Sequence, residues 1–148
     1  MKYLTALAAL SVLTVVTMCL KGCPGIHPDY EVALPNGYAL ARANPYDIAI
    51  CDQRRIRVVP PRVASLGVWG DLVFGQVEAS HNPSLEDDDE WTRAEKARQE
   101  KAIGYFLINT KTHEVRLGLA KDAWLAALHE SGVPGEPKLR KPSRWFRY

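Results

Sequence analysis

The chain has 148 residues, of which 47% are apolar, so it is long enough for one domain with a real core and too short for two comfortable ones. This composition excludes wholesale disorder. The charge is divided unevenly: residues 23–133 contain 12 basic and 16 acidic side chains, whereas residues 134–148 contain five basic side chains and one acidic side chain. The basic character therefore belongs to the C-terminal tail and not to the predicted domain.

The N-terminus has the layout of an export signal. Lys2 precedes an apolar stretch from Leu4 to Leu20, which gives a positive n-region and an apolar h-region. The stretch is also almost long enough to span a bilayer, so an uncleaved membrane anchor is an alternative. We predict that residues 1–22 are a signal peptide and that residues 23–33 form a spacer between the membrane and the domain.

The end of the leader carries a more specific motif. Residues 20–23, with the sequence Leu-Lys-Gly-Cys, resemble the lipobox of bacterial lipoproteins, although Lys21 stands where a small uncharged residue is usual. The resemblance implies that the thiol of Cys23 is acylated and that cleavage makes Cys23 the first mature residue. In a bacterium with two membranes it also implies outer-membrane delivery, because Pro24 is not an inner-membrane retention residue. Cys19 ends a competing motif, and a plain anchor or a secreted form remains an alternative.

Short apolar runs separated by Gly, Pro, Asn and Asp follow one another through the first part of the body. A turn at residues 34–37, whose Asn-Gly pair tolerates positive φ, opens the series. The predicted strands are residues 38–42, 47–51 and 56–59, with two more short strands between residues 63 and 78. Regular spacing of this kind favours an antiparallel sheet over alternating strand and helix units.

Residues 80–101 form a polar insertion that we predict to be a peripheral helix. Ser84 and Asp87 have the spacing of a capping box, and the carboxylates of residues 86–90 would suit the positive end of the helix dipole. Trp91 and a few alanines give only a thin apolar stripe, so the helix should attach loosely. The carboxylate run lacks the EF-hand pattern, and a solvated helix start explains it better than a Ca²⁺ site.

Residues 104–133 are the segment around which the rest of the domain is organised. An apolar run starts at Tyr105, turn residues follow over 109–112, and apolar side chains then alternate with others over 115–119. Two such runs joined by a short polar connection predict a β-hairpin.

The same segment ends in a predicted helix that closes the domain. Over residues 121–131 the apolar period changes, and Trp124 and Leu128 share one helical face. Gly132 stands where a left-handed helix cap belongs, and Pro134 follows soon after it. We therefore expect Trp124 and Leu128 to anchor this helix to the sheet.

The sequence shows no catalytic or metal-binding motif, and we predict no catalytic residue, metal or cofactor. The four histidines do not have metal-ligand spacing. Asp71 is the best isolated carboxylate, but a turn aspartate accounts for it, and Ser65 and Cys51 lack the context of a nucleophile. Cys51 is expected to be a small buried apolar residue, and a bridge to Cys23 is the alternative if lipidation does not occur.

The tail, residues 134–148, combines basic and aromatic side chains. The candidate surface-binding residues are Lys138, Arg140, Lys141, Arg144, Trp145, Phe146 and Arg147. Such a combination binds anionic lipid headgroups, glycans or nucleic acid, and export argues against nucleic acid. In the alternative interpretation Trp145 and Phe146 fold back on the domain as a last edge strand, with the charges in water.

The leader, the opening of the domain at residues 34–38 and its closing module at residues 105–133 together resemble small bacterial lipoproteins of unknown function. The predicted fold is α+β: one antiparallel sheet of five to seven strands, one packed C-terminal helix and one peripheral helix, with residues 34–133 as a single domain. We predict a non-enzymatic envelope lipoprotein, held at the membrane by a lipid anchor and acting through contacts with an envelope protein partner. An immunity or inhibitor protein, and an envelope enzyme, are the alternatives.

Overall fold

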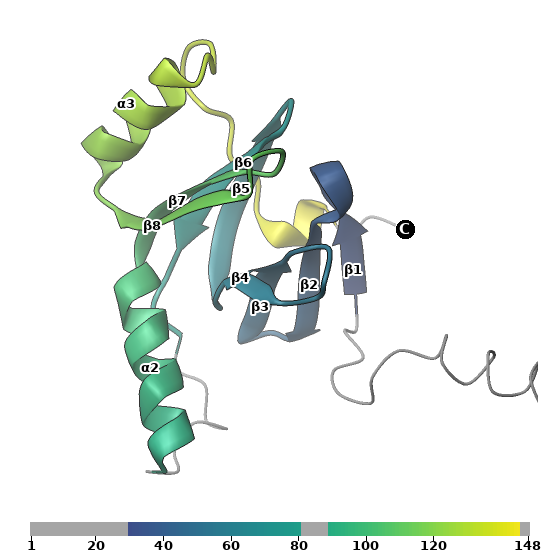
Figure 1. Ribbon diagram of the computed structural model, residues 1–148, viewed down its shortest axis with the longest axis vertical. Coiled ribbons are helices and arrows are strands. Elements are labelled where there is room, and N and C mark those ends of the chain that lie inside the picture. Colours follow the sequence, from purple (N-terminus) through teal and green to yellow (C-terminus); the bar gives the residue numbers. More distant parts are fainter. Residues whose placement is uncertain (1–29, 81–88, 146–148) are drawn as a thin grey trace, which may run out of the picture.

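The strands lie in two antiparallel sheets in the computed structural model, which describes residues 30–80 and 89–145 (Figure 1). The first sheet contains β1 (Tyr30–Ala33), β2 (Ala39–Asn44), β3 (Asp47–Cys51) and β4 (Arg57–Val59), in that order. The second contains β5 (Val63–Trp69), β6 (Leu72–Val77), β7 (Gly104–Asn109) and β8 (Glu114–Leu119), also in chain order. The helices are α2 (Glu90–Ala102) and α3 (Lys121–Glu130), with short 3-10 turns η1 (Pro35–Gly37) and η3 (Pro142–Arg144).

This architecture confirms the α+β class and corrects the prediction of one sheet with five to seven strands. The described residues form two sheets of four strands each. The division falls between β4 and β5, where Pro60 and Pro61 interrupt the chain. Proline has no N–H to donate to a ladder, so the chain leaves the first sheet here and begins another.

Two further boundaries differ from the sequence prediction. Residues 30–33, predicted as part of a spacer, form β1 and pair with β2 through four residue positions from Tyr30 with Arg42 to Ala33 with Ala39. The packed helix α3 is also not the last ordered element, because the chain continues to η3. Cys23 and the leader lie outside the described residues.

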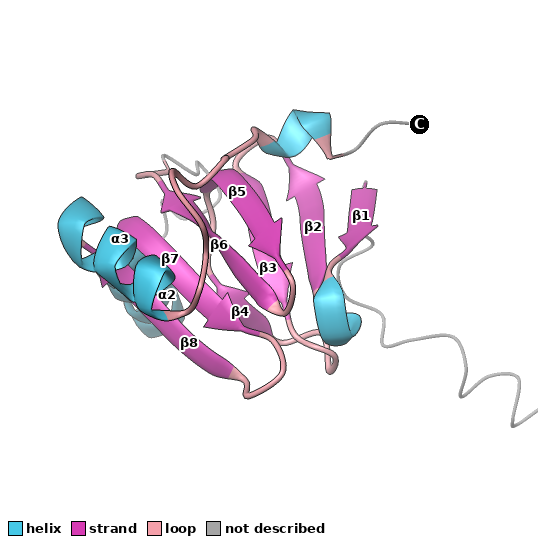
Figure 2. Cartoon of the chain, turned by 90° about the horizontal axis from the view of Figure 1, so that it is seen from above, coloured by secondary structure: helices cyan, strands magenta, loops and turns pink. Residues whose placement is uncertain are grey.

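The core lies between the facing sides of the two sheets (Figure 2). Because side chains alternate along a strand, one side of each sheet supplies the core. Leu40, Ile50 and Val59 come from the first sheet, and Phe106 and Ile108 from the second; all five are fully buried. Gly75 lies opposite Phe106, and a Cβ there would be 2.0 Å from a backbone carbonyl oxygen of β5, so this position excludes any larger residue.

Helix α3 forms a third layer on the other side of the second sheet (Figure 1). Trp124 is 2% exposed, stacks on Tyr105 with ring centroids 4.5 Å apart, and donates its Nε1 proton to the carbonyl of Phe106 at 3.0 Å. Leu128, also 2% exposed, packs in the same cluster. The prediction that Trp124 and Leu128 lie on the packed face is confirmed.

The end of α3 also follows the sequence prediction. Gly132 has φ +84°, in the left-handed region. Its N–H bonds to the carbonyl of His129, and the N–H of Val133 bonds to the carbonyl of Leu128. These are the two hydrogen bonds of a Schellman cap, and the side chains of Val133 and Leu128 share the outer apolar cluster, which completes the motif.

Helix α2 is peripheral, as predicted, but begins at Glu90 and not at the capping box proposed from Ser84, which lies outside the described residues. Asp89 caps it by accepting the N–H of Thr92 at 2.6 Å, which lowers the pKa of that carboxyl. The helix projects beyond the sheet (Figure 1), and Trp91 is 69% exposed. Its C-terminal end approaches β8 at Gly118, where a Cβ would lie 2.3 Å from the carbonyl oxygen of Lys101.

Candidate functional site

Three turns meet at one end of the molecule in a polar junction, formed by Asn36, Tyr38, Asp71, Thr110 and His113. The Asn36 amide donates to Oδ1 of Asp71 at 2.9 Å and to Oγ1 of Thr110 at 2.8 Å. Thr110, which is fully buried, donates its hydroxyl proton to the Asp71 carbonyl at 2.7 Å. Asn36 reaches these partners from a left-handed conformation with φ +54°. The contacts join η1 of the first sheet to both hairpins of the second.

Tyr38 and His113 extend the same junction. The Tyr38 hydroxyl lies 3.0 Å from Nδ1 of His113, and the two rings stack with centroids 6.0 Å apart. Burial raises the pKa of Tyr38, and the negative charge of Asp52 raises it further, while Arg54 acts against both. The hydroxyl therefore stays protonated at neutral pH and can donate to an unprotonated Nδ1.

This junction brings together Asp71 and His113, which the sequence presented as separate turn residues. Each of the five residues is hydrogen-bonded to another member of the junction, so the observed arrangement holds the sheet ends together. The sequence carried one signal for it, the Asn36-Gly37 turn, but did not indicate which hairpins that turn would contact.

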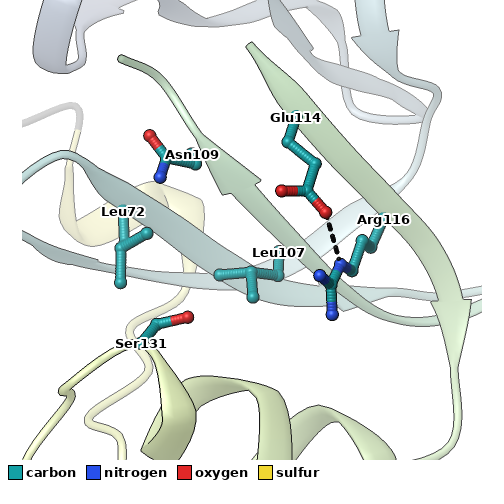
Figure 3. Close-up of a pocket in the computed structure, with 6 residues that line it drawn as sticks. All are labelled: Leu72, Leu107, Asn109, Glu114, Arg116 and Ser131. Carbon is teal, nitrogen blue, oxygen red and sulfur yellow. Dashed lines mark hydrogen bonds and ion pairs between the residues drawn. The ribbon is translucent and has the colours of Figure 1, made fainter. Parts of the chain in front are cut away.

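A shallow hollow of about 50 Å³ opens on the outer side of the second sheet, beside the end of α3 (Figure 3). It is lined by Leu72, Leu107, Asn109, Glu114, Arg116 and Ser131. Glu114 accepts from Nε of Arg116 at 2.8 Å at its rim (Figure 3). Small-molecule pockets usually enclose about 300–1,000 Å³, so this hollow suits a water or one small side chain rather than a substrate.

Trp69 belongs to the same end of this sheet. It pairs with Leu72 in the ladder, and directly opposite residues of an antiparallel pair project to the same face. Its side chain is 50% exposed, although most tryptophans are largely buried. We name Trp69 together with the six residues of the hollow the hairpin-end patch.

Cys51 is a buried free thiol in β3. Burial raises its pKa, and the neighbouring Arg57 and Arg55 oppose that effect only in part. A thiol with a raised pKa is a poor nucleophile, in keeping with the prediction of a small buried apolar residue. Within residues 30–80 and 89–145, no three His, Cys, Asp or Glu side chains are grouped closely enough to hold a metal ion.

The tail lies along the outer edge of β5. Arg140 and Leu66 exchange two backbone hydrogen bonds, at 2.9 and 3.0 Å, in a single antiparallel bridge. Trp145 is half-buried against the core between the sheets. The edge-strand interpretation is thus replaced by one bridge at Arg140 followed by the turn η3.

The basic side chains of the tail point away from this contact. Lys138, Arg140, Lys141 and Arg144 are all exposed, and none forms an ion pair with another described residue. Phe146 and Arg147 lie outside the described residues.

No helix in the described part of the chain is both long and apolar enough to cross a bilayer. No protein-family model, curated protein or solved structure matches this chain.

Proposed function

We propose that the protein is an exported, non-enzymatic lipoprotein of the bacterial cell envelope, attached to the membrane through Cys23 and acting by contact with another envelope protein. The support for the attachment is the leader and its lipobox-like end at residues 20–23. The support for a protein contact is the hairpin-end patch, where Trp69 is half-exposed beside a hollow of side-chain size.

The chemistry of the patch suits the centre of a protein interface. Tryptophan and arginine carry a large share of binding energy in such interfaces, and Trp69 and Arg116 lie on one face of the sheet. The hollow beside them would receive a small side chain of the partner, and Asn109 and Glu114 would supply polar groups around it. A stable interface covers about 800 Å² on each partner, so the patch would form the middle of a larger contact.

Lipid attachment is tested by metabolic labelling with a radioactive fatty acid. Cys23→Ser should abolish incorporation and leave the full-length precursor, whereas Cys19→Ser should be labelled as strongly as the unaltered protein. Continued labelling of Cys23→Ser, or loss of labelling in Cys19→Ser alone, contradicts attachment at Cys23.

Protein contact is tested by capture of partners from solubilised envelopes with the lipidated protein. Trp69→Ala should weaken the capture of a specific partner about thirtyfold, because truncating a hot-spot residue costs about 2 kcal/mol or more. Trp91→Ala is the matched control, since Trp91 is 69% exposed but lies on α2. Equal capture by both variants would exclude the patch. If the captured partner is an enzyme that loses activity on binding, the protein acts as an inhibitor or immunity protein.

A further inference from the structure

The tail is fastened to the domain by backbone contacts that leave its basic side chains exposed. Besides the two hydrogen bonds between Arg140 and Leu66, the carbonyl oxygen of Lys138 lies 2.6 Å from the position of a Cβ built on Gly67. Only a glycine in β5 permits so close an approach. Pro142 is buried and Trp145 is half-buried, so the segment from 138 to 145 is held along the edge of β5.

Four cations project from this fastened segment. Lys138, Arg140, Lys141 and Arg144 are exposed over seven consecutive positions, and we name them the basic strip. Residues 23–133 carry more acidic than basic side chains, 16 against 12. The strip is thus a concentrated positive edge on a domain whose remaining charge is negative.

The C-terminal end of the strip, at η3, lies on the same side of the molecule as β1, the first described strand (Figures 1 and 2). Turn η3 lies beside β2 and close to β1 in both views (Figures 1 and 2). Tyr30, the first residue of β1, is seven positions after Cys23, and a fully extended chain of that length spans at most about 25 Å. With Cys23 acylated, as the proposed function requires, Tyr30 at the start of β1 must stay within that distance of the bilayer.

We infer that the basic strip is a second membrane contact, which binds the headgroups of anionic lipids and turns the β5 edge of the domain toward the bilayer. Each Lys or Arg near an anionic surface contributes about 1 kcal/mol, which changes the ratio of membrane-bound to unbound strip about fivefold. One flexible tether leaves a domain free to rotate, whereas a tether combined with a charged edge defines its orientation.

The experiment uses the full chain, isolated from membranes and reconstituted into vesicles. One set of vesicles contains phosphatidylcholine alone and the other contains one third phosphatidylglycerol. An amine-reactive reagent followed by mass spectrometry measures the modification of Lys138 and Lys141, with Lys96 on the projecting helix α2 as the internal reference. Anionic vesicles should protect Lys138 and Lys141 severalfold and leave Lys96 unchanged. About 1 M NaCl should remove the protection, because the Debye length falls to about 3 Å.

Two double variants that each remove two positive charges distinguish binding by the strip from nonspecific electrostatic attraction of the whole protein to the vesicles. Arg140→Gln combined with Arg144→Gln should lower the equilibrium constant for contact between the strip and the vesicle surface about twenty-five-fold, or fivefold for each cation, so the protection of the two lysines should be lost. Arg54→Gln combined with Arg116→Gln removes two exposed cations elsewhere and should leave the protection in place.

The anchor and the strip can fail separately in this experiment. Recovery of the protein with the vesicles at about 1 M NaCl reports the anchor, and lysine protection at low salt reports the strip. An anchored protein whose Lys138 and Lys141 react equally in both kinds of vesicle overturns the inference. Protection by soluble polyphosphate in the absence of any protection by anionic vesicles also overturns it, since the partner is then not a membrane.

Discussion

Replacing Leu128 by alanine should destabilise the domain by removing the outer layer's second anchor. Leu128 is 2% exposed in the cluster that joins α3 to the second sheet. Truncating a buried leucine costs about 2–5 kcal/mol, because the lost burial is accompanied by a cavity. Trp124 keeps its hydrogen bond to the Phe106 carbonyl, so α3 should stay packed on the sheet. We therefore expect a destabilisation in the lower part of that range.

The size of this effect is large compared with the stability of the domain. A small domain is stable by about 5–15 kcal/mol, and for a chain of this length 1 kcal/mol shifts Tm by about 3–6 °C. Leu128→Ala should therefore lower Tm by at least about 6 °C, measured by circular dichroism on the chain from residue 24 onward. Urea unfolding followed by tryptophan fluorescence should show a lower midpoint with an unchanged slope.

Arg116→Ala is the control for this measurement. Arg116 is exposed and its ion pair with Glu114 lies at the surface, where such pairs contribute about 0–1 kcal/mol. Its Tm should change by only a few degrees at most. If Leu128→Ala and Arg116→Ala have equal effects, α3 does not pack on the sheet through the face described above.

Three more predictions concern single positions. Gly75→Ala should prevent folding, since its Cβ would lie 2.0 Å from a carbonyl oxygen. Gly70→Ala meets no atom within 4 Å and should cost only about 1–2 kcal/mol, from the positive φ of that position. Equal stabilities of the two variants in urea unfolding would refute the packing at β6. Burial and the raised pKa of Cys51 should keep its thiol unreactive toward a disulfide reagent at pH 8 until denaturant is added, and rapid native reaction would show that β3 is open. Trp145→Ala should lower Tm by several degrees, and an unchanged Tm would show that the tail does not dock in solution.

Local signals account for the parts of the fold that were predicted correctly. The β7–β8 hairpin follows from two apolar runs around Asn109, whose side chain accepts the N–H groups of Lys111 and Thr112 across the turn. The end of α3 follows from Gly132, the residue that most readily adopts positive φ. In both places the deciding contacts join residues only a few positions apart, so the local sequence is enough to predict them.

The sites were less predictable than the elements. Asp71, Thr110 and Asn36 are ordinary turn residues in the sequence, and only the meeting of three turns makes them a junction. The tail shows the same limit: its composition indicated cations and aromatics, but the position of Arg140 opposite Leu66 depends on which edge of which sheet is open.

The sequence by itself determined the α+β class, the face of α3 that is buried and the division of charge between body and tail. Only the tertiary structure decided that the strands form two sheets, that Tyr30–Ala33 joins the first of them, and that the tail lies along β5. The physical reason is that alternating apolar residues show which side chains of a strand share a face, but they do not show what that face packs against. Backbone ladders between distant strands use the same N–H and C=O groups whatever the side chains are, so the choice of partner is made when the sheets pack.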